Sequence, residues 1–262
     1  MDKTTLGDRM KTYERVPEGN LLRKTPVILR VDGKAFHTFT KGMKKPVDAG
    51  LQFCMLQTAR GLCDAIDGAK IAYMQSDEIS ILVTDWSSLD TQPWFDYRIQ
   101  KVASVTSSLA TALFNEAKNQ TMFEVRGSMV EGAKVPSALF DCRAFNVPAH
   151  EVVNYFLWRQ QDATRNSIQG LAQANFSHRQ LHGKNNNVMQ EMLFSEKGIN
   201  WNDCPTGQKR GFCVVNRETM EKAVVRGELV PVVRSRWEVD EEIPVFSQDR
   251  DYIQSLVDQG VR

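Results

Sequence analysis

The sequence predicts an α+β protein in which a ferredoxin-like domain is followed by additional helices and a C-terminal extension. Short runs with an apolar residue at every second position alternate with longer segments whose apolar residues recur every three or four positions. Over residues 1–150 these segments follow the order β-α-β-β-α-β, which is the order of the split βαβ unit. The pattern then becomes mainly helical, and short strands return over the last 50 residues.

The elements of the first part can be assigned in order. They are a helix over 6–16, a strand over 25–32, a helix over 48–67, strands over 70–75 and 78–85, a helix over 98–117 and a strand over 137–145. Val27, Leu29 and Val31 alternate in the first strand, as expected for a half-buried strand. Asp67-Gly68 provides a stop signal for the second helix.

The second part is predicted less completely. Residues 149–195 are expected to be helical, with a break near His182-Gly183. Short strands follow, one of them over 229–237, in an arrangement that the pattern does not define. We therefore expect a catalytic domain over 1–147 and a helical and C-terminal segment over 148–262 that packs on it.

Topology is expected to bring two distant acidic residues together. A right-handed crossover makes the strands at 25–32 and 70–75 parallel. The turn after the second strand then lies at the same edge of the sheet as the end of the first. We therefore expect Asp32 and Asp77, 45 residues apart, to converge at this edge.

Composition is that of an ordinary globular protein, with 42% hydrophobic and 25% charged residues. The chain has no apolar run of about 18 residues and no apolar secretory signal, so we expect no membrane partner and a cytoplasmic location. Five cysteines without C-x-x-C spacing argue against a disulfide framework or a zinc site. Residues 1–45 carry eleven Lys/Arg and five Asp/Glu, a balance that suits a phosphate-rich partner but also occurs on ordinary surfaces.

Two carboxylates at one sheet edge suit Mg²⁺, which takes oxygen ligands from carboxylates, phosphates and water. Gly33 adds a turn whose carbonyl could approach a metal without obstruction by a side chain. Glu78 could be a third ligand or could accept hydrogen bonds from nearby donors. The alternative is that Asp32-Gly33 and Ser76-Asp77 are ordinary turn dipeptides.

Basic residues near these carboxylates could hold a triphosphate. Lys34, His37, Lys44 and Lys45 follow the first carboxylate, and Arg98 and Lys101 open a helix, where backbone N–H groups also favour phosphate. Each of them could equally be a solvated surface residue. The remaining histidines show no metal-ligand spacing and receive no role.

Six segments of the chain resemble the tRNA-His guanylyltransferase superfamily. They are RVDGKAFHTF (30–39), QSDEIS (75–80), FDCRAF (140–145), YFLWRQQDATRNSI (155–168), EMLFSEKGINWN (191–202) and KRG (209–211). The resemblance is closest to the guanylyltransferase-like proteins of bacteria and archaea. It implies a palm-like catalytic domain similar to that of conventional polymerases, two Mg²⁺ ions, ATP and GTP or another NTP as substrates, tRNA as partner, and a homotetramer built as a dimer of dimers.

The resemblance also implies roles for individual residues. Asp32, Gly33 and Asp77 would bind metal, and Asp32, Asp77 and Glu78 would be catalytic. The expected nucleotide-binding residues are Lys34, Ala35, Phe36, His37, Lys44, Ser76 and Lys101. The expected tRNA-binding residues are Arg159, Arg165, Asn166, Ser167, Lys184, Asn185, Lys209 and Arg210.

The sequence departs from the family pattern at two places. Guanylyltransferases proper usually carry an H-I-N-N motif where this chain has Thr164-Arg165-Asn166-Ser167, and Lys34 stands where the family often has Arg. The first departure favours template-dependent 3′-5′ repair of truncated tRNA 5′ ends, through 5′-adenylylation by ATP and attack by the 3′-hydroxyl of an incoming NTP. The alternatives are G−1 addition to tRNA-His, a palm-type nucleotide cyclase or conventional polymerase, and a tRNA-binding chaperone with a vestigial metal site.

Overall fold

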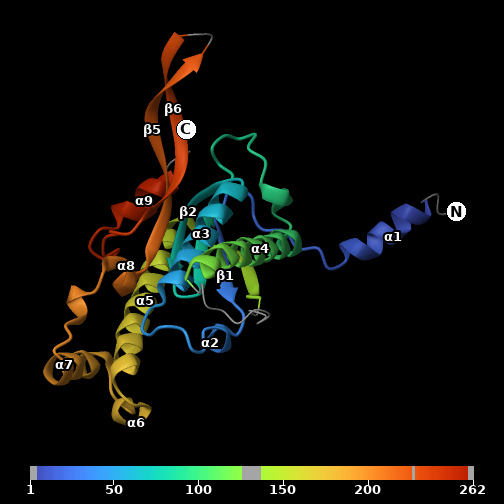
Figure 1. The fold of residues 1–262 in the computed structure, drawn as a ribbon. Coiled ribbons are helices and arrows are strands. Elements are labelled where there is room, and N and C mark those ends of the chain that lie inside the picture. The colour runs from blue at the N-terminus through green and yellow to red at the C-terminus, as the bar shows by residue number, and fades with distance from the viewer. Residues whose placement is uncertain (1–4, 126–136, 226–227, 259–262) are drawn as a thin grey trace.

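A single six-stranded sheet organises the protein in the computed structural model, which describes residues 5–125, 137–225 and 228–258 (Figure 1). The strand order is β4-β1-β3-β2-β5-β6, and every neighbouring pair is antiparallel. The strands are β1 (Val27–Gly33), β2 (Ala69–Gln75), β3 (Glu78–Val83), β4 (Phe140–Asn146), β5 (Phe212–Val225) and β6 (Glu228–Asp240). Because β1 and β2 both pair antiparallel with β3, they run parallel to each other, as predicted.

Helices cover both faces of the sheet. On one face α3 (Ala49–Ala65) and α4 (Ile99–Val125) pack on residues such as Leu29 and Ile81. On the other face α5 (Val152–Asn175) and α9 (Asp251–Asp258) pack on residues such as Ile28 and Leu82. With β1 to β4, helices α3 and α4 complete the predicted ferredoxin-like βαββαβ order, so the predicted fold class is confirmed.

The remaining helices are short or peripheral. They are α1 (Leu6–Arg15), α2 (Phe36–Phe39), α6 (His178–Leu181), α7 (Asn186–Lys197) and α8 (Thr206–Arg210), with 3-10 turns at Trp94–Tyr97, Ala149–Glu151 and Trp201–Asp203. In Figure 1, α1 extends away from the body, and α6 and α7 lie at the end opposite to the tips of β5 and β6. None of the helices in the described ranges combines the length and apolar character needed to cross a membrane.

Two helical predictions need adjustment. Helix α4 continues to Val125, beyond the predicted end at 117, because no Gly or Pro interrupts residues 118–125. The predicted break near Gly183 is present between α6 and α7, but a second break follows α5 at Phe176. There Ser177 begins α6 with a capping box that involves Gln180.

The C-terminal strands differ most from the prediction. In place of short strands, β5 and β6 form a hairpin of 14 and 13 residues. Only Phe212 to Val215 pair with β2, and the rest projects beyond the sheet as a two-stranded arm (Figure 1). Residues 216–222 and 229–236 of this arm are mostly exposed and include several charged side chains, so they lack the alternation that identifies a half-buried strand. Strand β5 continues the sheet that the first 147 residues form. The predicted division of the chain into parts 1–147 and 148–262 therefore stays a prediction.

Candidate active site

The pairing of β1 with β3 and β4 places three carboxylates in one row. Asp32 lies opposite Glu78 on one side and opposite Asp141 on the other. Directly opposed residues of antiparallel strands share a face of the sheet. Asp77 occupies the adjoining turn, where its carbonyl accepts a hydrogen bond from the Gly33 N–H at 3.0 Å. The segments that carry Asp32 and Asp77 therefore meet at one edge, as the topology predicts.

Asp77 is electrostatically strained in a way that a cation would relieve. Burial raises the pKa of its carboxyl group, and the negative charge of Asp32 raises it further. A hydrogen bond from the Ser76 hydroxyl, at 3.0 Å, opposes this shift. Two partly buried carboxylates that repel each other, beside the Gly33 backbone, are suitable ligands for Mg²⁺.

The protein alone does not supply a complete metal shell. Among the described residues, no three His, Cys, Asp or Glu side chains are arranged to hold a metal ion. Mg²⁺ commonly uses one or two carboxylates together with waters and substrate phosphates. The Asp32–Asp77 pair therefore fits an ion that arrives with, or is completed by, a nucleotide.

Glu78 is engaged by a buried arginine from α5. Arg159 donates from Nε to Glu78 Oε1 at 2.7 Å and from a terminal nitrogen to Oε2 at 2.8 Å. Burial raises the pKa of Glu78, and Arg159 opposes that rise. For Arg159, burial favours a lower pKa, but Glu78 and Asp162 outweigh it and raise the pKa. Arg159 therefore fixes Glu78 through two parallel hydrogen bonds, at one end of the acidic row that Glu78, Asp32 and Asp141 form.

This ion pair corrects two interpretations of the sequence. Arg159 is only 5% exposed, so it has no free surface for the contact with tRNA that was predicted for it. Of the two alternatives for Glu78, the structure favours the hydrogen-bond acceptor over the third metal ligand, because both of its oxygens face Arg159. Sequence spacing could not reveal this, since 81 residues separate the partners.

A pocket of about 580 Å³ opens beside Asp77. Its size is in the range of ligand pockets that bury a small molecule. It lies between the end of β1, the loop from α2 to α3, helix α5 and helix α8. The predicted residues that line it are Gly33, Ala35, Phe36, His37, Lys44, Lys45, Ser76, Asp77, Asn166 and Ser167. The pocket thus brings residues of the predicted catalytic domain together with residues of α5 beside Asp77.

Two residues expected to bind nucleotide lie outside the pocket. Lys34 is exposed and its N–H donates to the Leu139 carbonyl. Lys101 precedes Phe114 by 13 residues on α4, which separates them by roughly 20 Å along the helix. Because the Phe114 ring packs on Phe36 at the pocket, Lys101 lies at the far end of the helix, over the ring of Phe95. Lys101 therefore lies too far from this pocket to bind a nucleotide there within the same chain, contrary to the prediction.

The residues expected to contact tRNA are distributed along α5 to α8. Several of them already have partners in the fold, which the sequence analysis missed. Ser167 accepts from the Trp201 indole at 3.0 Å, Asn185 caps α7, and Lys209 donates to the Asn202 carbonyl at 2.6 Å. Arg165, Asn166 and Lys184 are exposed, and Arg210 is partly exposed. The side chains of these four reach the surface, although Arg165 also forms an ion pair with Asp162.

Two arginines near the acidic row were not singled out from the sequence. Arg30 and Arg143 lie directly opposite each other on β1 and β4, one row away from Asp32 and Asp141. Like charges in this position repel each other, and the buried Nε of Arg30 has no hydrogen-bond partner among the described residues. A bound anion would reduce the repulsion between the two arginines and would accept a hydrogen bond from the Arg30 Nε. The signal was present in the sequence, since Arg30 and Asp32, like Arg143 and Asp141, are two residues apart and so share a face.

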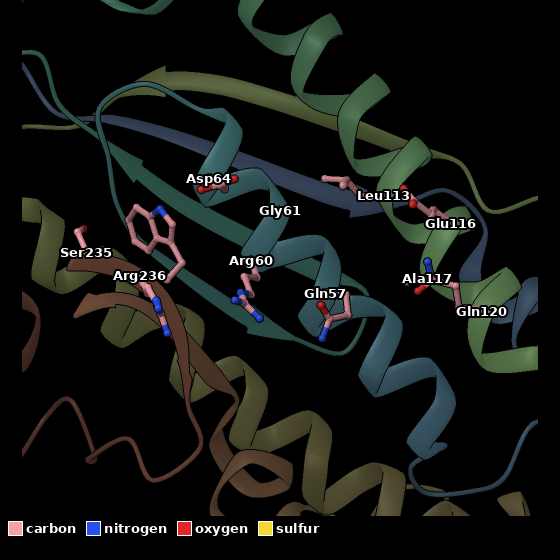
Figure 2. Close-up of a pocket in the computed structure, with 11 residues that line it drawn as sticks. Gln57, Arg60, Gly61, Asp64, Leu113, Glu116, Ala117, Gln120, Ser235 and Arg236 are labelled. Carbon is pink, nitrogen blue, oxygen red and sulfur yellow. The ribbon is translucent and has the colours of Figure 1, made fainter. Parts of the chain in front are cut away.

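A smaller cavity of about 380 Å³ lies between α3, α4 and β6 (Figure 2). Figure 2 shows Arg60 and Asp64 on α3, Glu116 on α4 and Arg236 on β6 around it. None of the predicted site residues lines this cavity. The larger pocket is therefore the candidate active site.

Fold and site together define a palm-like domain that presents paired carboxylates beside a pocket large enough for a nucleotide. Comparison with known proteins identifies the family: residues 7–148, more than half of the chain, match tRNAHis guanylyltransferase. The chain therefore belongs to the tRNA-His guanylyltransferase family and is a nucleotidyltransferase that adds nucleotides to tRNA.

Individual relatives agree with this assignment. A bacterial tRNA(His) guanylyltransferase-like protein in complex with ATP is 46% identical, with a TM-score of 0.82, 97% of this chain covered and 99% of that chain. A bacterial guanylyltransferase-like protein in complex with GTP is 43% identical, with a TM-score of 0.78 and coverage of 97% and 100%. The tRNA(His) guanylyltransferase of Schizosaccharomyces pombe is 32% identical over 217 residues, which are 77% of each chain.

Proposed function

We propose that this enzyme adds nucleotides in the 3′-5′ direction to the 5′ end of tRNA, and that its main work is template-dependent repair of truncated 5′ ends. The observation that carries the proposal is the pocket of about 580 Å³ that joins Asp77 to Asn166 and Ser167 of α5. It is supported by the similar bacterial proteins that were solved with ATP and with GTP. The proposal includes a cytoplasmic location, which stays a prediction.

The proposed reaction has two stages. First, an oxygen of the tRNA 5′-monophosphate attacks the α-phosphate of ATP, and pyrophosphate leaves. The 3′-hydroxyl of an incoming nucleoside triphosphate then attacks the activated 5′-phosphate, loses its proton, and AMP leaves. If the RNA already carries a 5′-triphosphate, the second stage alone suffices and pyrophosphate is the leaving group.

In this proposal the residues at the sheet edge position the reacting groups. Asp32 and Asp77 would hold two Mg²⁺ ions, which supply neutralisation of the phosphate charge and a lower pKa for the attacking hydroxyl. Lys44 and His37 line the pocket and can meet the triphosphate of the bound nucleotide. The Arg159–Glu78 pair holds β3 to α5 and so keeps the two walls of the site in register.

The preference for repair rests on the part of α5 that departs from the family motif. Thr164 stands at the position of the motif histidine, and Asn166 and Ser167 line the pocket. Arg165 is exposed and can contact a phosphate through two N–H groups without reading a base. A site of this kind leaves the choice of nucleotide to pairing with the opposite strand, so G is added against C and U against A.

The direct test is incubation of the enzyme with ATP, NTPs and a tRNA that lacks its first 5′ nucleotide, in competition with intact tRNA-His. We expect the truncated tRNA to be restored first, with the base that pairs with its templating partner, as read by end sequencing. Preferential addition of G to intact tRNA-His, regardless of the opposite base, would establish the second candidate function, G−1 addition. Growth at the 3′ end would indicate a conventional polymerase instead.

The metal ligands are tested separately. We expect Asp32→Ala and Asp77→Ala each to abolish both activation and nucleotide addition, because each removes one carboxylate from the pair. Asp64→Ala is the matched control, since Asp64 is an exposed carboxylate at the other cavity. Normal turnover by a folded Asp32 or Asp77 variant at saturating Mg²⁺ would contradict the assignment.

The proposal also includes a homotetramer built as a dimer of dimers. Two apolar surfaces support it. Helix α1 has no buried residue within the described chain, although Leu6, Met10 and Tyr13 lie along one side of it. On the projecting arm, Met220 and Val233 face each other across the strands and are 78% and 61% exposed. Burial of such surfaces against further copies would stabilise both elements.

A further inference from the structure

Trp158 is a large aromatic side chain on α5 that remains 47% exposed, although its helix neighbour Arg159 is buried. It is also held in place. The Tyr155 ring contacts it in a T-shaped arrangement with ring centroids 5.9 Å apart, and the Arg159 guanidinium lies 4.4 Å from its centroid. Because Glu78 fixes Arg159, the indole rests on a rigid support. An exposed aromatic ring with a fixed orientation can stack on a partner without a large entropy cost.

The location of Trp158 follows from its neighbours. The Tyr155 ring packs against the ring of Phe145 on β4, with the ring centroids 5.9 Å apart. The Tyr155 hydroxyl lies 2.8 Å from the hydroxyl of Ser80 on β3. This flank of α5 therefore lies towards β1 and β4, beside the acidic row. Arg165 follows Trp158 by seven residues, or two helical turns, so both occupy the same flank.

The charges of this region suit a nucleic acid. Arg30 and Arg143 lie beside the acidic row on the same face of the sheet, and the exposed Arg165 extends from α5. Trp158 precedes the pocket residue Asn166 by eight positions, which is about 12 Å along the helix. An aromatic ring among basic groups at this distance from a nucleotide pocket is the arrangement that proteins use to stack the bases of single strands and strand ends.

We propose that Trp158 stacks on the base at the 5′ end of the tRNA acceptor strand and so positions the strand end for extension. The inference rests on the proposed function, because it assumes that a tRNA end enters beside the pocket. Trp158 is a positioning residue in this proposal, and nucleotide choice is left to base pairing. The indole would replace the stacking partner that the truncated strand lacks.

The test measures binding of tRNA without nucleotides, using wild-type enzyme and the variants Trp158→Phe and Trp158→Leu. One tRNA lacks its first 5′ nucleotide, and a second is identical except that its terminal 5′ residue is abasic. We expect Trp158→Leu to weaken binding of the first tRNA about tenfold and Trp158→Phe to weaken it far less, because Phe retains a π face. The abasic tRNA should bind the wild type and Trp158→Leu equally.

Controls separate stacking from a structural role. Phe194→Leu changes another exposed aromatic residue, 61% exposed on α7, and should not produce a base-dependent loss. The KM for ATP should stay the same in all variants, and binding is compared at a temperature at which the melting curve of each variant shows it fully folded. Unchanged binding of the truncated tRNA by Trp158→Leu, or an equal loss for both tRNAs, would overturn the proposal. Failure of the wild type to extend any tRNA 5′ end would instead overturn the proposed function.

Discussion

At the scale of single residues, the ion pair between Arg159 and Glu78 decides which carboxylates are free. It occupies both oxygens of Glu78, so of the three carboxylates predicted to be catalytic Asp32 and Asp77 stay open to a metal ion. Arg159 also contacts Asp162 at 3.1 Å, and Asp162 in turn pairs with the exposed Arg165. One buried side chain therefore connects the acidic row to the outer surface of α5.

We predict that Arg159→Met lowers the free energy of unfolding by about 3–5 kcal/mol, because it leaves the buried carboxylate of Glu78 without its partner. The double variant Arg159→Met/Glu78→Gln should recover part of this loss, since it removes the isolated charge. Chemical denaturation at neutral pH measures both. If the double variant were as unstable as the single one, the loss would come from packing and not from the charge.

The same variant should respond to pH in a defined direction. Burial already raises the folded-state pKa of Glu78 above its ordinary value, and loss of Arg159 raises it further. An acid whose pKa is raised by folding destabilises the protein above that pKa and loses the penalty as pH falls through it. We therefore expect the difference in stability between Arg159→Met and the wild type to shrink towards acidic pH. A difference that grows as pH falls would contradict this.

At the scale of elements, the hairpin of β5 and β6 extends well beyond the part that pairs with the rest of the sheet. Only its base pairs with β2, whereas an isolated two-stranded ribbon is marginally stable in water. Ion pairs on one face, such as Arg236 with Glu221 at 2.8 Å, support the arm locally. The opposite face carries the exposed pair of Met220 and Val233.

We predict that Met220→Lys/Val233→Glu converts the proposed tetramer to smaller species. The new side chains lie opposite each other, so their attraction preserves the hairpin while the apolar contact is lost. Sedimentation velocity or light scattering gives the mass. Arg234→Lys is the control, since it keeps the charge on an exposed neighbour. An unchanged tetramer in the double variant would exclude this surface from the interface.

At the scale of the whole molecule, charge is unevenly distributed although the net charge is +1. The first 45 residues are basic, and exposed cations such as Arg165, Arg179 and Lys184 follow along α5 to α7. Both regions include residues of the candidate active site, such as His37 and Asn166. Such a distribution favours a partner that is held by its phosphates and shape more than by its bases.

We predict that the affinity for tRNA falls about tenfold or more between 50 and 200 mM monovalent salt, because binding releases counterions from the phosphates. Arg165→Ala should reduce the salt dependence by removing one such contact, whereas Glu191→Gln on α7 should not. Binding measured over a salt series gives the slope of log affinity against log salt. A flat response would show that phosphate contacts do not dominate the interface.

The sequence by itself determined the βαββαβ order, the family and the meeting of Asp32 with Asp77. These follow from local rules: the periodicity of strands and helices, the parallel direction that a crossover imposes, and the position of turns such as Ser76-Asp77. The pocket confirms that Gly33, His37, Lys44 and Asn166 lie together, although their roles remain proposals.

Tertiary structure alone decided what depends on packing between distant segments. Tertiary packing pairs Glu78 with Arg159, leaves Trp158 exposed on the same helix turn, and places Lys101 at the far end of α4. It also joined β5 to β2, so that the final strands extend the sheet. Partners 81 residues apart leave no periodic signal in the chain, because only the packing of α5 on β3 brings an arginine over a buried carboxylate.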